Sequence, residues 1–306
     1  MAFVNSSSAQ IDFSLETPFL SFPALTDIPF VKHGFSTKLG GVSEGMFAAM
    51  NLGSESLPYQ DSPANILENY RRMASAIGFD VNTIVVSHQT HTANVREVKE
   101  DDRGKGLFCP RDYSDIDGLI TNRANLTLVT KYADCVPLFF ADPVKKAIGL
   151  SHAGWRGTVA GIGKVTVEAL HNAYGCDPED IIAVIGPSIC ADCYEIGREV
   201  AEEFLRAFPG GVSDGAGTDD RADYIAAGED NAFRDMDEHI LIPRDNGKYL
   251  CDLWAANRKI LREAGLKGSN IHTSGVCTSC NSELLFSHRR TGGKRGSLAA
   301  FLSIAE

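Results

Sequence analysis

The sequence lacks any long hydrophobic run. No apolar stretch approaches the ~20 residues that a membrane-spanning helix needs, and residues 1–20 have neither a basic start nor a long apolar centre. We therefore expect no membrane anchor and no export signal, and we predict a cytoplasmic protein. Basic charge is also scarce: the formal net charge is −11 and the pI is near 5.2. This balance argues against a general nucleic-acid or membrane surface.

Histidine is scarce as well. The chain has eight histidines and no His-x-His pair, whereas a multicopper centre needs about ten imidazoles, largely in such pairs. The sequence therefore argues against a multicopper oxidase site. The H-x-E and P-C-x-x-C signature of zinc-dependent cytidine deaminases is also absent, so any deamination here needs a different zinc geometry.

What is present fits a globular protein with a full core. Of the 306 residues, 43% are hydrophobic and 23% are charged. Without an export signal, the eight cysteines are expected to be reduced thiols. Helical segments alternate with strands, but several strands are joined by tight turns. We therefore predict an α/β (α+β) fold with mixed sheets rather than a regular doubly wound sheet.

The pattern predicts helices over residues 62–79, 158–174, 198–208 and 248–265. Ser62 would cap the first of them, and Gly265 would end the last. Extended segments are predicted within 1–20, 83–98, 126–154 and 181–188, and in much of the chain after residue 270. Residues 209–239 are acidic and glycine-rich with little periodicity. We interpret them as a surface insertion within a single domain spanning 1–306.

Three potential metal ligands stand in separate, turn-flanked runs. His91 lies in SHQTHTANV (87–95), Cys135 in KYADCVPLFF (131–140) and His152 in GLSHAGWRGTVAG (149–161). Two imidazoles and one thiolate leave one tetrahedral position open, as in a catalytic zinc site. The alternative is that His152 caps a strand and Cys135 is a small buried hydrophobe. We expect Zn²⁺, although Cu²⁺ could also occupy such a site.

Several long runs resemble the YfiH-like laccase-domain family, which is also known for multicopper polyphenol oxidase or purine nucleoside phosphorylase activity. The runs are HGFSTKLGGVS (33–43), HQTH, ADCVPL, HAGWRGTVAGI, IGPSICADCYEIG (185–197) and CTSC…LLFSHRRTGGKRG (277–296). They cover nearly the whole chain in the family's order. The resemblance implies a YfiH-like α-β-β-α sandwich and assigns the metal to His91, Cys135 and His152. In two departures, Lys38 stands where the family usually has Arg, and Thr291 where Asp is common.

The resemblance also implies purine nucleoside chemistry. Adenosine, inosine or 5′-methylthioadenosine would be cleaved by phosphate, with adenosine deamination as a second activity. The expected partners are a nucleoside and phosphate, without nucleic acid or membrane, and the oligomeric state is left open. The candidate catalytic residues are Cys135, Asp134, His33 and Arg156. The candidate substrate and phosphate contacts are Lys38, Gln89, Arg156, Arg289 and Arg290.

Rival functions remain at this stage. Cys135 could be a nucleophile with His152 as its base, which would give a cysteine amidase that edits cell-wall peptide precursors. A weak copper-dependent phenol oxidase and a non-catalytic metal-binding protein are further alternatives. Asp134 and Glu195 could each orient a ligand histidine, shuttle a proton or be buried structural acids.

Two C-x-x-C pairs remain, Cys190/Cys193 and Cys277/Cys280. More than 80 residues separate them, which is far from the short spacing of zinc ribbons. We therefore expect structural cysteines near strand ends. A four-thiolate zinc site and a redox pair are the alternatives.

Overall fold

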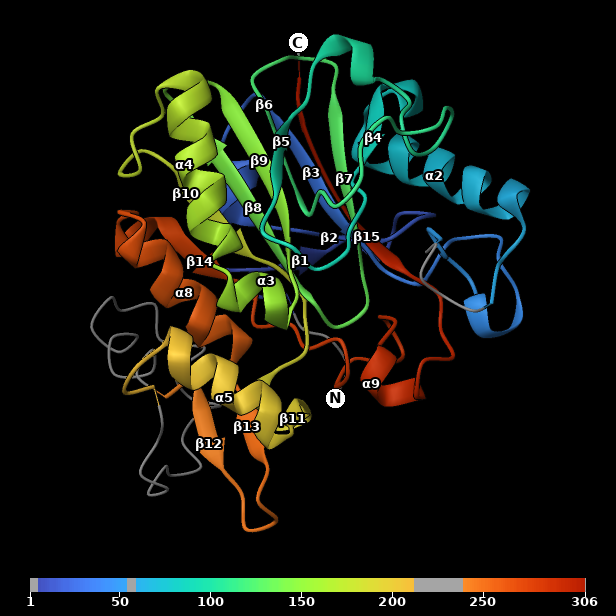
Figure 1. Ribbon diagram of the computed structural model, residues 1–306. Helices are drawn as coiled ribbons and strands as arrows, with labels where there is room; N and C mark the ends of the chain where they lie inside the picture. The colour runs from blue at the N-terminus through green and yellow to red at the C-terminus, as the bar shows by residue number, and fades with distance from the viewer. Residues whose placement is uncertain (1–4, 54–58, 212–238, 306) are drawn as a thin grey trace.

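Two six-stranded sheets form the centre of the computed structural model, which describes residues 5–53, 59–211 and 239–305 (Figure 1). The first sheet has the strand order β1 (Gln10–Ile11), β2 (Phe19–Ser21), β3 (Val31–Ser36), β15 (Leu298–Ile304), β7 (Thr127–Tyr132) and β4 (Ile84–Val86). The second has the order β14 (Ile271–Thr273), β10 (Ile182–Ile185), β8 (Val136–Asp142), β9 (Ala147–Ala153), β6 (Gly118–Thr121) and β5 (Val95–Glu97).

Both sheets are mixed. The pairs β4/β7, β5/β6 and β10/β14 are parallel, and the other neighbours in these two sheets are antiparallel. Antiparallel neighbours such as β8 and β9 need only a tight turn between them, whereas parallel neighbours need a longer connection. A tight turn at 143–146 joins β8 to β9, as the sequence predicted for several of its strands.

Helices cover the outer faces of the two sheets (Figure 1). On the first sheet, α2 (Pro63–Ile77) packs through Tyr70 and Met73 onto a cluster that includes Phe301. On the second, α4 (Ile162–Tyr174) and α8 (Leu253–Glu263) pack over β9 and β10. The layers therefore run helix, sheet, sheet, helix. The predicted α-β-β-α sandwich with mixed sheets is confirmed.

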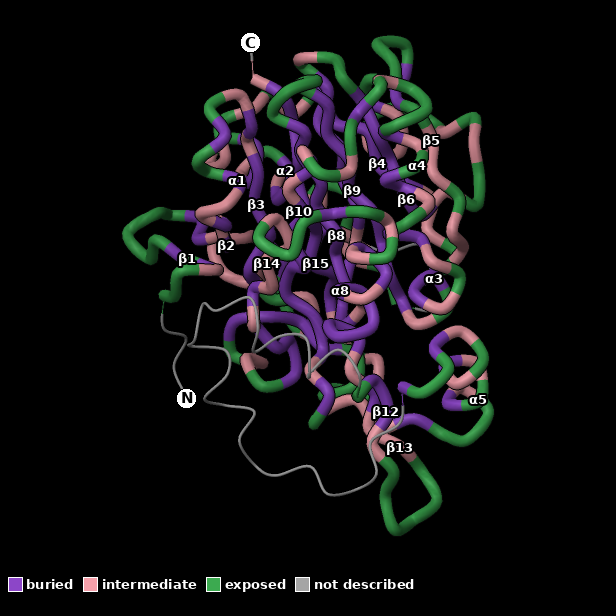
Figure 2. The backbone as a smooth tube through the Cα atoms, turned by 90° about the vertical axis from the view of Figure 1, so that its left-hand side faces the viewer, coloured by how far each residue is buried: buried purple, intermediate pink, exposed green. Residues whose placement is uncertain are grey.

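One hydrophobic core lies between the two sheets. Fully buried side chains from both meet there, among them Phe35, Leu128, Phe139, Leu150 and Leu302. Figure 2 shows that the buried backbone is concentrated in these strands and that the connecting loops are exposed. Burying a side chain of this size stabilises the fold by about 1.5–3 kcal/mol relative to leaving it exposed, so the packing fixes the position of one sheet against the other.

Two predicted helices are corrected. The helix predicted over 158–174 is two helices, α3 (Trp155–Val159) and α4, because Gly161 adopts a left-handed conformation (φ 72°) between them. The segment 248–265 begins as a strand, β13 (Tyr249–Cys251), in a small sheet of order β11 (Glu195–Ile196), β13 and β12 (Leu241–Pro243). Asp252 then accepts a hydrogen bond from the backbone N–H of Ala255 and starts α8.

Three further α-helices lie among the described residues: α1 (Pro23–Thr26), α5 (Arg198–Ala207) and α9 (His288–Thr291). The α9 helix corrects the strand expected around LLFSHRR, because the Ser287 side chain accepts a hydrogen bond from Arg290 N and caps a helical turn.

The acidic segment lies almost entirely outside the described residues, which stop at Gly211 and resume at residue 239. Its two described flanks meet: the backbone N–H groups of Ile240 and Leu241 both donate to the Gly211 carbonyl, at 3.0 and 2.9 Å. The chain therefore leaves and re-enters the fold at one place. Among the described residues, no helix is long and apolar enough to span a membrane.

Candidate functional site

A cleft of about 390 Å³ opens beside the ends of β7 and β9, where the two large sheets approach each other. Its walls combine the three predicted metal ligands with several cations and hydroxyl groups. The lining residues are Ser87, His88, Gln89, Thr90, His91, Arg111, Lys131, Tyr132, Ala133, Cys135, His152, Arg295 and Ser297.

Each metal-ligand candidate comes from a different segment. His91 lies in the loop after β4 and has a left-handed backbone (φ 67°). Cys135 lies in the three-residue connection between β7 and β8. His152 is the penultimate residue of β9, and its main chain pairs with Pro137 of β8. The adjacent strands β8 and β9 therefore bring Cys135 and His152 together, and the β4–β5 loop adds His91.

The three side chains are close enough to share one ion. One ligand atom from each of His91, Cys135 and His152 lies within 4.8 Å of the others. The Cys135 Sγ is 3.9 Å from His91 Nε2. Zn–N bonds of about 2.0 Å and a Zn–S bond of about 2.3 Å require separations of this order. The donor set fits a metal with one coordination position left for water or substrate.

Asp117 orients His152. Its Oδ1 lies 2.7 Å from His152 Nδ1, which leaves Nε2 for a metal. Both residues are buried, with relative exposures of 0% and 3%. A carboxylate that holds the second ring nitrogen fixes the tautomer of a ligand histidine and raises its basicity. Asp117 also accepts backbone N–H bonds from Thr90, His91 and Thr92, at 3.1, 3.1 and 2.8 Å, so it shapes the His91 loop too.

The electrostatics favour a thiolate beside an imidazolium when no metal is bound. Burial raises the pKa of the Cys135 thiol, but the neighbouring His152 and His91 bring that pKa down to about 6. Burial lowers the pKa of His152, but the Cys135 charge and the hydrogen bond to Asp117 raise it to about 9. Burial would likewise raise the pKa of Asp117, yet the His152 contact and the backbone N–H groups leave it below its ordinary value.

Gly154 leaves the space that the ligands occupy. A Cβ atom at this position would stand 2.7 Å from His91 Cδ2 and 3.1 Å from Cys135 Sγ. Both distances are too short for unstrained contacts, so any side chain here would push two ligands away. The glycine in the run HAGWRG therefore has a steric role at the site.

Two further predicted residues lie near the ligands. Gln89 lines the cleft, but its side chain bonds the backbone of Lys131 in β7 through both ends, at 2.7 Å each. Asp134 follows β7 with a left-handed backbone (φ 88°). Its carboxylate accepts hydrogen bonds from the Thr278 hydroxyl (2.6 Å) and from Arg289 N (2.7 Å). The carboxylate that orients His152 is Asp117 rather than Asp134.

His33 is not brought to the cleft. It is buried in β3, where its Nε2 accepts a hydrogen bond from Phe22 N at 2.8 Å. Burial lowers its pKa to about 4. The imidazole is therefore neutral and already has a partner within the first sheet.

The predicted phosphate-binding cations also lie outside the cleft lining. Lys38 Nζ donates to the Ser282 carbonyl at 2.5 Å. The exposed Arg156 stacks on Trp155, with 4.3 Å between its guanidinium carbon and the ring centroid. Arg289 donates to the Glu195 carbonyl at 2.8 Å, and Arg290 is exposed on α9. Their role in phosphate binding stays a prediction. Glu195 is bound to Lys248 at 2.6 Å, in the small sheet.

Sequence reasoning missed three residues at the site, Asp117, Arg111 and Lys131. Asp117 precedes the apolar run GLIT, but a single acidic residue before a strand does not indicate which side chain its carboxylate will bind. Arg111 and Lys131 reach the cleft from a loop and from β7. Arg295 stands in the same run, HRRTGGKRG, as Arg289 and Arg290, but unlike them it lines the cleft. The Nε of Arg295 is buried and has no hydrogen-bond partner among the described residues.

The chain belongs to the multi-copper polyphenol oxidoreductase laccase family, whose model matches residues 32–305. This confirms the family predicted from the sequence. The chain is 38% identical to purine nucleoside phosphorylase YlmD of Bacillus subtilis over 277 residues, which are 89% of this chain and 88% of the relative. It is 31% identical over 239 residues to adenosine deaminase RL5 of an unknown prokaryotic organism, covering 77% of this chain and 80% of the relative.

The fold also matches a solved structure. The crystal structure of the Bacillus licheniformis hypothetical protein YfiH superposes with a TM-score of 0.79 and 32% sequence identity. The match covers 96% of this chain and 98% of the other. The likeness therefore extends over both sheets and their helices.

Proposed function

We propose that this chain is a zinc-dependent purine nucleoside phosphorylase, with adenosine deamination as a second activity. Adenosine, inosine and 5′-methylthioadenosine are the proposed substrates. The names of the relatives support the substrate class, since one is a purine nucleoside phosphorylase and another an adenosine deaminase. The observation that carries the proposal is the convergence of His91, Cys135 and His152 within 4.8 Å in a cleft that cations also line.

His91, Cys135 and His152 would hold the zinc ion. Bound there, Zn²⁺ would supply Lewis-acid chemistry to a water or a substrate heteroatom. The chain's own residues do the rest: Asp117 keeps His152 in one tautomer, and the Cys135 thiolate offsets part of the metal's charge. Arg111, Lys131 and Arg295 give the cleft a positive wall, which favours a phosphate dianion.

The decisive assay follows adenosine turnover with and without phosphate. Zinc-loaded protein should release ribose 1-phosphate and adenine when phosphate is present, whereas deamination to inosine and ammonia should need only water. Both products can be separated by chromatography. Nucleoside cleavage that yields free ribose at the same rate with or without phosphate would contradict phosphorolysis.

Arg295 is the cation for which the structure gives the clearest phosphate test, because its Nε lacks a partner among the described residues. Losing a charge-assisted hydrogen bond costs about 1.5–3 kcal/mol, so Arg295→Gln should raise the phosphate KM roughly ten- to a hundred-fold. The zinc content should stay normal. Arg198→Gln is the matched control, since Arg198 is exposed on α5 and does not line the cleft. A phosphate KM in Arg295→Gln equal to that of Arg198→Gln would remove Arg295 from the phosphate site.

A cysteine hydrolase is the second candidate, and one observation favours it. In the metal-free protein, Cys135, His152 and Asp117 form a thiolate, imidazolium and carboxylate series, the arrangement that activates a cysteine nucleophile. The two functions respond to a chelator in opposite ways. Removing the metal should abolish phosphorolysis, whereas it should uncover an amidase and allow iodoacetamide to alkylate Cys135 with loss of that activity.

A further inference from the structure

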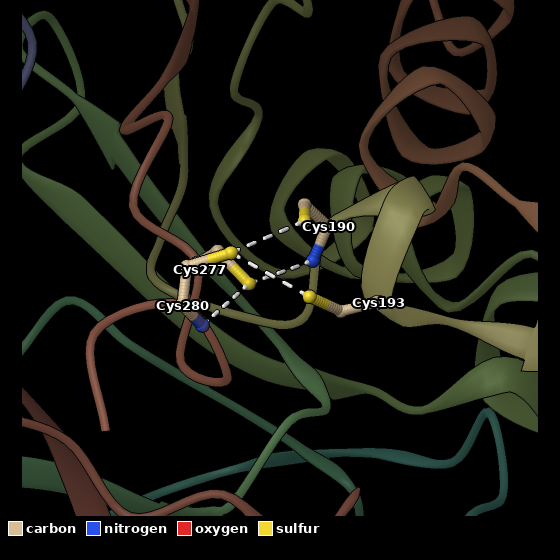
Figure 3. Close-up of side chains that lie close together, drawn as sticks. All are labelled: Cys190, Cys193, Cys277 and Cys280. Atoms are coloured by element: carbon tan, nitrogen blue, oxygen red, sulfur yellow. Dashed lines mark hydrogen bonds between the residues drawn. The ribbon is translucent and has the colours of Figure 1, made fainter. Parts of the chain in front are cut away.

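Four cysteines gather at a second place on the molecule. The Sγ atoms of Cys190, Cys193, Cys277 and Cys280 all lie within 4.8 Å of one another (Figure 3). From the sequence spacing we expected structural cysteines near strand ends for both C-x-x-C pairs, with a four-thiolate zinc site and a redox pair as alternatives. The fold brings the two pairs together even though more than 80 residues separate them in the sequence.

Parallel strand pairing explains the meeting. β10 and β14 are parallel neighbours, so the segments that follow them leave the sheet at the same edge. An isolated parallel bridge between Ser188 and Cys277 continues the pairing beyond the strands. One C-x-x-C pair then spans a single turn, η4 (Ala191–Cys193), and the other lies in the turn at 277–280.

The spacing of the sulfurs fits a single tetrahedral ion. Zn–S bonds of about 2.3 Å place neighbouring sulfurs of a tetrahedral site about 3.8 Å apart. The Cys193 and Cys280 sulfurs are 3.5 Å apart, and those of Cys190 and Cys280 are 4.0 Å apart. A disulfide requires about 2.05 Å, and all four cysteines are free. In an iron–sulfur cluster the cysteines bind different iron atoms, so the cysteine sulfurs would lie further apart than they do here.

The backbone around the cluster also favours negatively charged sulfur. The N–H groups of Cys190 and Cys280 both donate to Cys277 Sγ, at 3.3 and 3.4 Å. Hydrogen bonds to a charged acceptor are the stronger ones, so two donors on one sulfur suit a thiolate better than a thiol. A thiolate is the form that binds a metal.

We propose that Cys190, Cys193, Cys277 and Cys280 form a structural Zn²⁺ site, separate from the catalytic centre. Four soft sulfur ligands in a tetrahedron select zinc or iron over harder cations, and four protein ligands leave no position for substrate. The ion would anchor the segment that carries Thr278, whose hydroxyl binds Asp134 next to Cys135. The second site would thus help to position one wall of the first.

Metal content tests the site in the full-length protein. Protein purified without chelator should contain about two zinc ions per chain, one for each site. The double variant Cys193→Ser/Cys280→Ser should lose about one of them and keep the other. Cys109→Ser is the matched control, because Cys109 is exposed and belongs to neither cluster, and its zinc content should equal that of the wild type.

A second measurement covers the case in which the double variant does not fold. Cys135→Ala leaves the four-cysteine site intact, and this protein reconstituted with Co²⁺ should show the intense sulfur-to-cobalt and d–d absorption of a tetrahedral four-thiolate ion. Zinc content that is equal in the double variant and in Cys109→Ser would overturn the proposal. A Cys193–Cys280 disulfide in the native protein, or bound iron in place of zinc, would also overturn it.

Discussion

Asp117 decides how well His152 can serve as a ligand. The Asp117→Asn side chain can still accept the Nδ1–H bond through its amide oxygen, but it lacks the negative charge that raises the basicity of the ring, and mutation of such a partner lowers metal affinity about 10–100-fold. We expect zinc binding, measured by competition with a chromophoric chelator, to weaken by that factor. Asp115→Asn is the control, since Asp115 is exposed and bonds Thr90 instead. Equal affinities for the two variants would show that the Asp117 contact does not tune the metal.

Gly154 gives a steric test of the same site. Gly154→Ala places a methyl group 2.7 Å from His91 Cδ2, so the His91 ring must move and the ligands separate. We expect at least a tenfold loss of zinc affinity while the fold is retained. Gly197→Ala has no atom within 4 Å of its new methyl group and should bind zinc normally. Unchanged affinity in Gly154→Ala would mean that His91 is not a ligand.

The pH dependence of zinc binding follows from the shifted pKa values of Cys135 and His152. Between pH values of about 6 and 9, Cys135 is a thiolate and His152 is protonated in the metal-free protein. Binding must then release one proton from His152, so the affinity of the catalytic site should rise about tenfold per pH unit over this range. Below about pH 6 a second proton must leave Cys135 and the dependence should steepen. Calorimetry in buffers of different ionisation enthalpy measures the released protons, and release of none near pH 7.5 would contradict the scheme.

At this scale the sequence predicted the three candidate ligands better than their surroundings. His91, Cys135 and His152 stand in long distinctive runs, and the structure brings all three together. Asp117 was missed because its contact with His152 depends on two neighbouring strands, β6 and β9. His33 and Lys38 share a run with the family but bond elsewhere. A run of similar residues does not show which of its side chains faces a cleft.

Elements with clear end signals were predicted well. The α2 helix begins at Pro63 and stops at Gly78, whose left-handed backbone (φ 89°) ends it. The segment 248–265 was harder, because its pattern of apolar residues suits a helix throughout. Its first residues form a strand because they pair with β11 and β12. The local sequence does not indicate a pairing partner as distant in the chain as β11.

The insertion predicted at 209–239 is testable through its flanks. Since Ile240 and Leu241 both donate to the Gly211 carbonyl, a short Gly/Ser linker in place of residues 212–238 should close without disturbing α5 or β12. Nucleoside turnover should stay within about threefold of the wild type, because no described flank lines the cleft. A hundred-fold lower kcat in a folded, metal-loaded variant would instead make this segment part of the active site.

At the scale of the whole molecule, the alternation of helices and tight-turned strands was enough to predict mixed sheets in a sandwich. It was not enough to predict which strands share a sheet. β15 near the C-terminus lies between β3 and β7, an arrangement that joins both ends of the sequence in one layer. The same long-range pairing places β10 beside β14, which is why the meeting of the two cysteine pairs escaped a spacing argument.

The connection from Ala133 to Cys135 is the shortest route between the two large sheets, since β7 belongs to one and β8 to the other. A connection of three residues can extend very little, so a sliding motion of one sheet over the other must displace Cys135. A metal held there would resist such sliding, because binding only to the native arrangement stabilises that arrangement. Pressure or heat that loosens the packing between the sheets should therefore release the ion before the protein unfolds globally. Metal occupancy would then report how tightly the two sheets are packed.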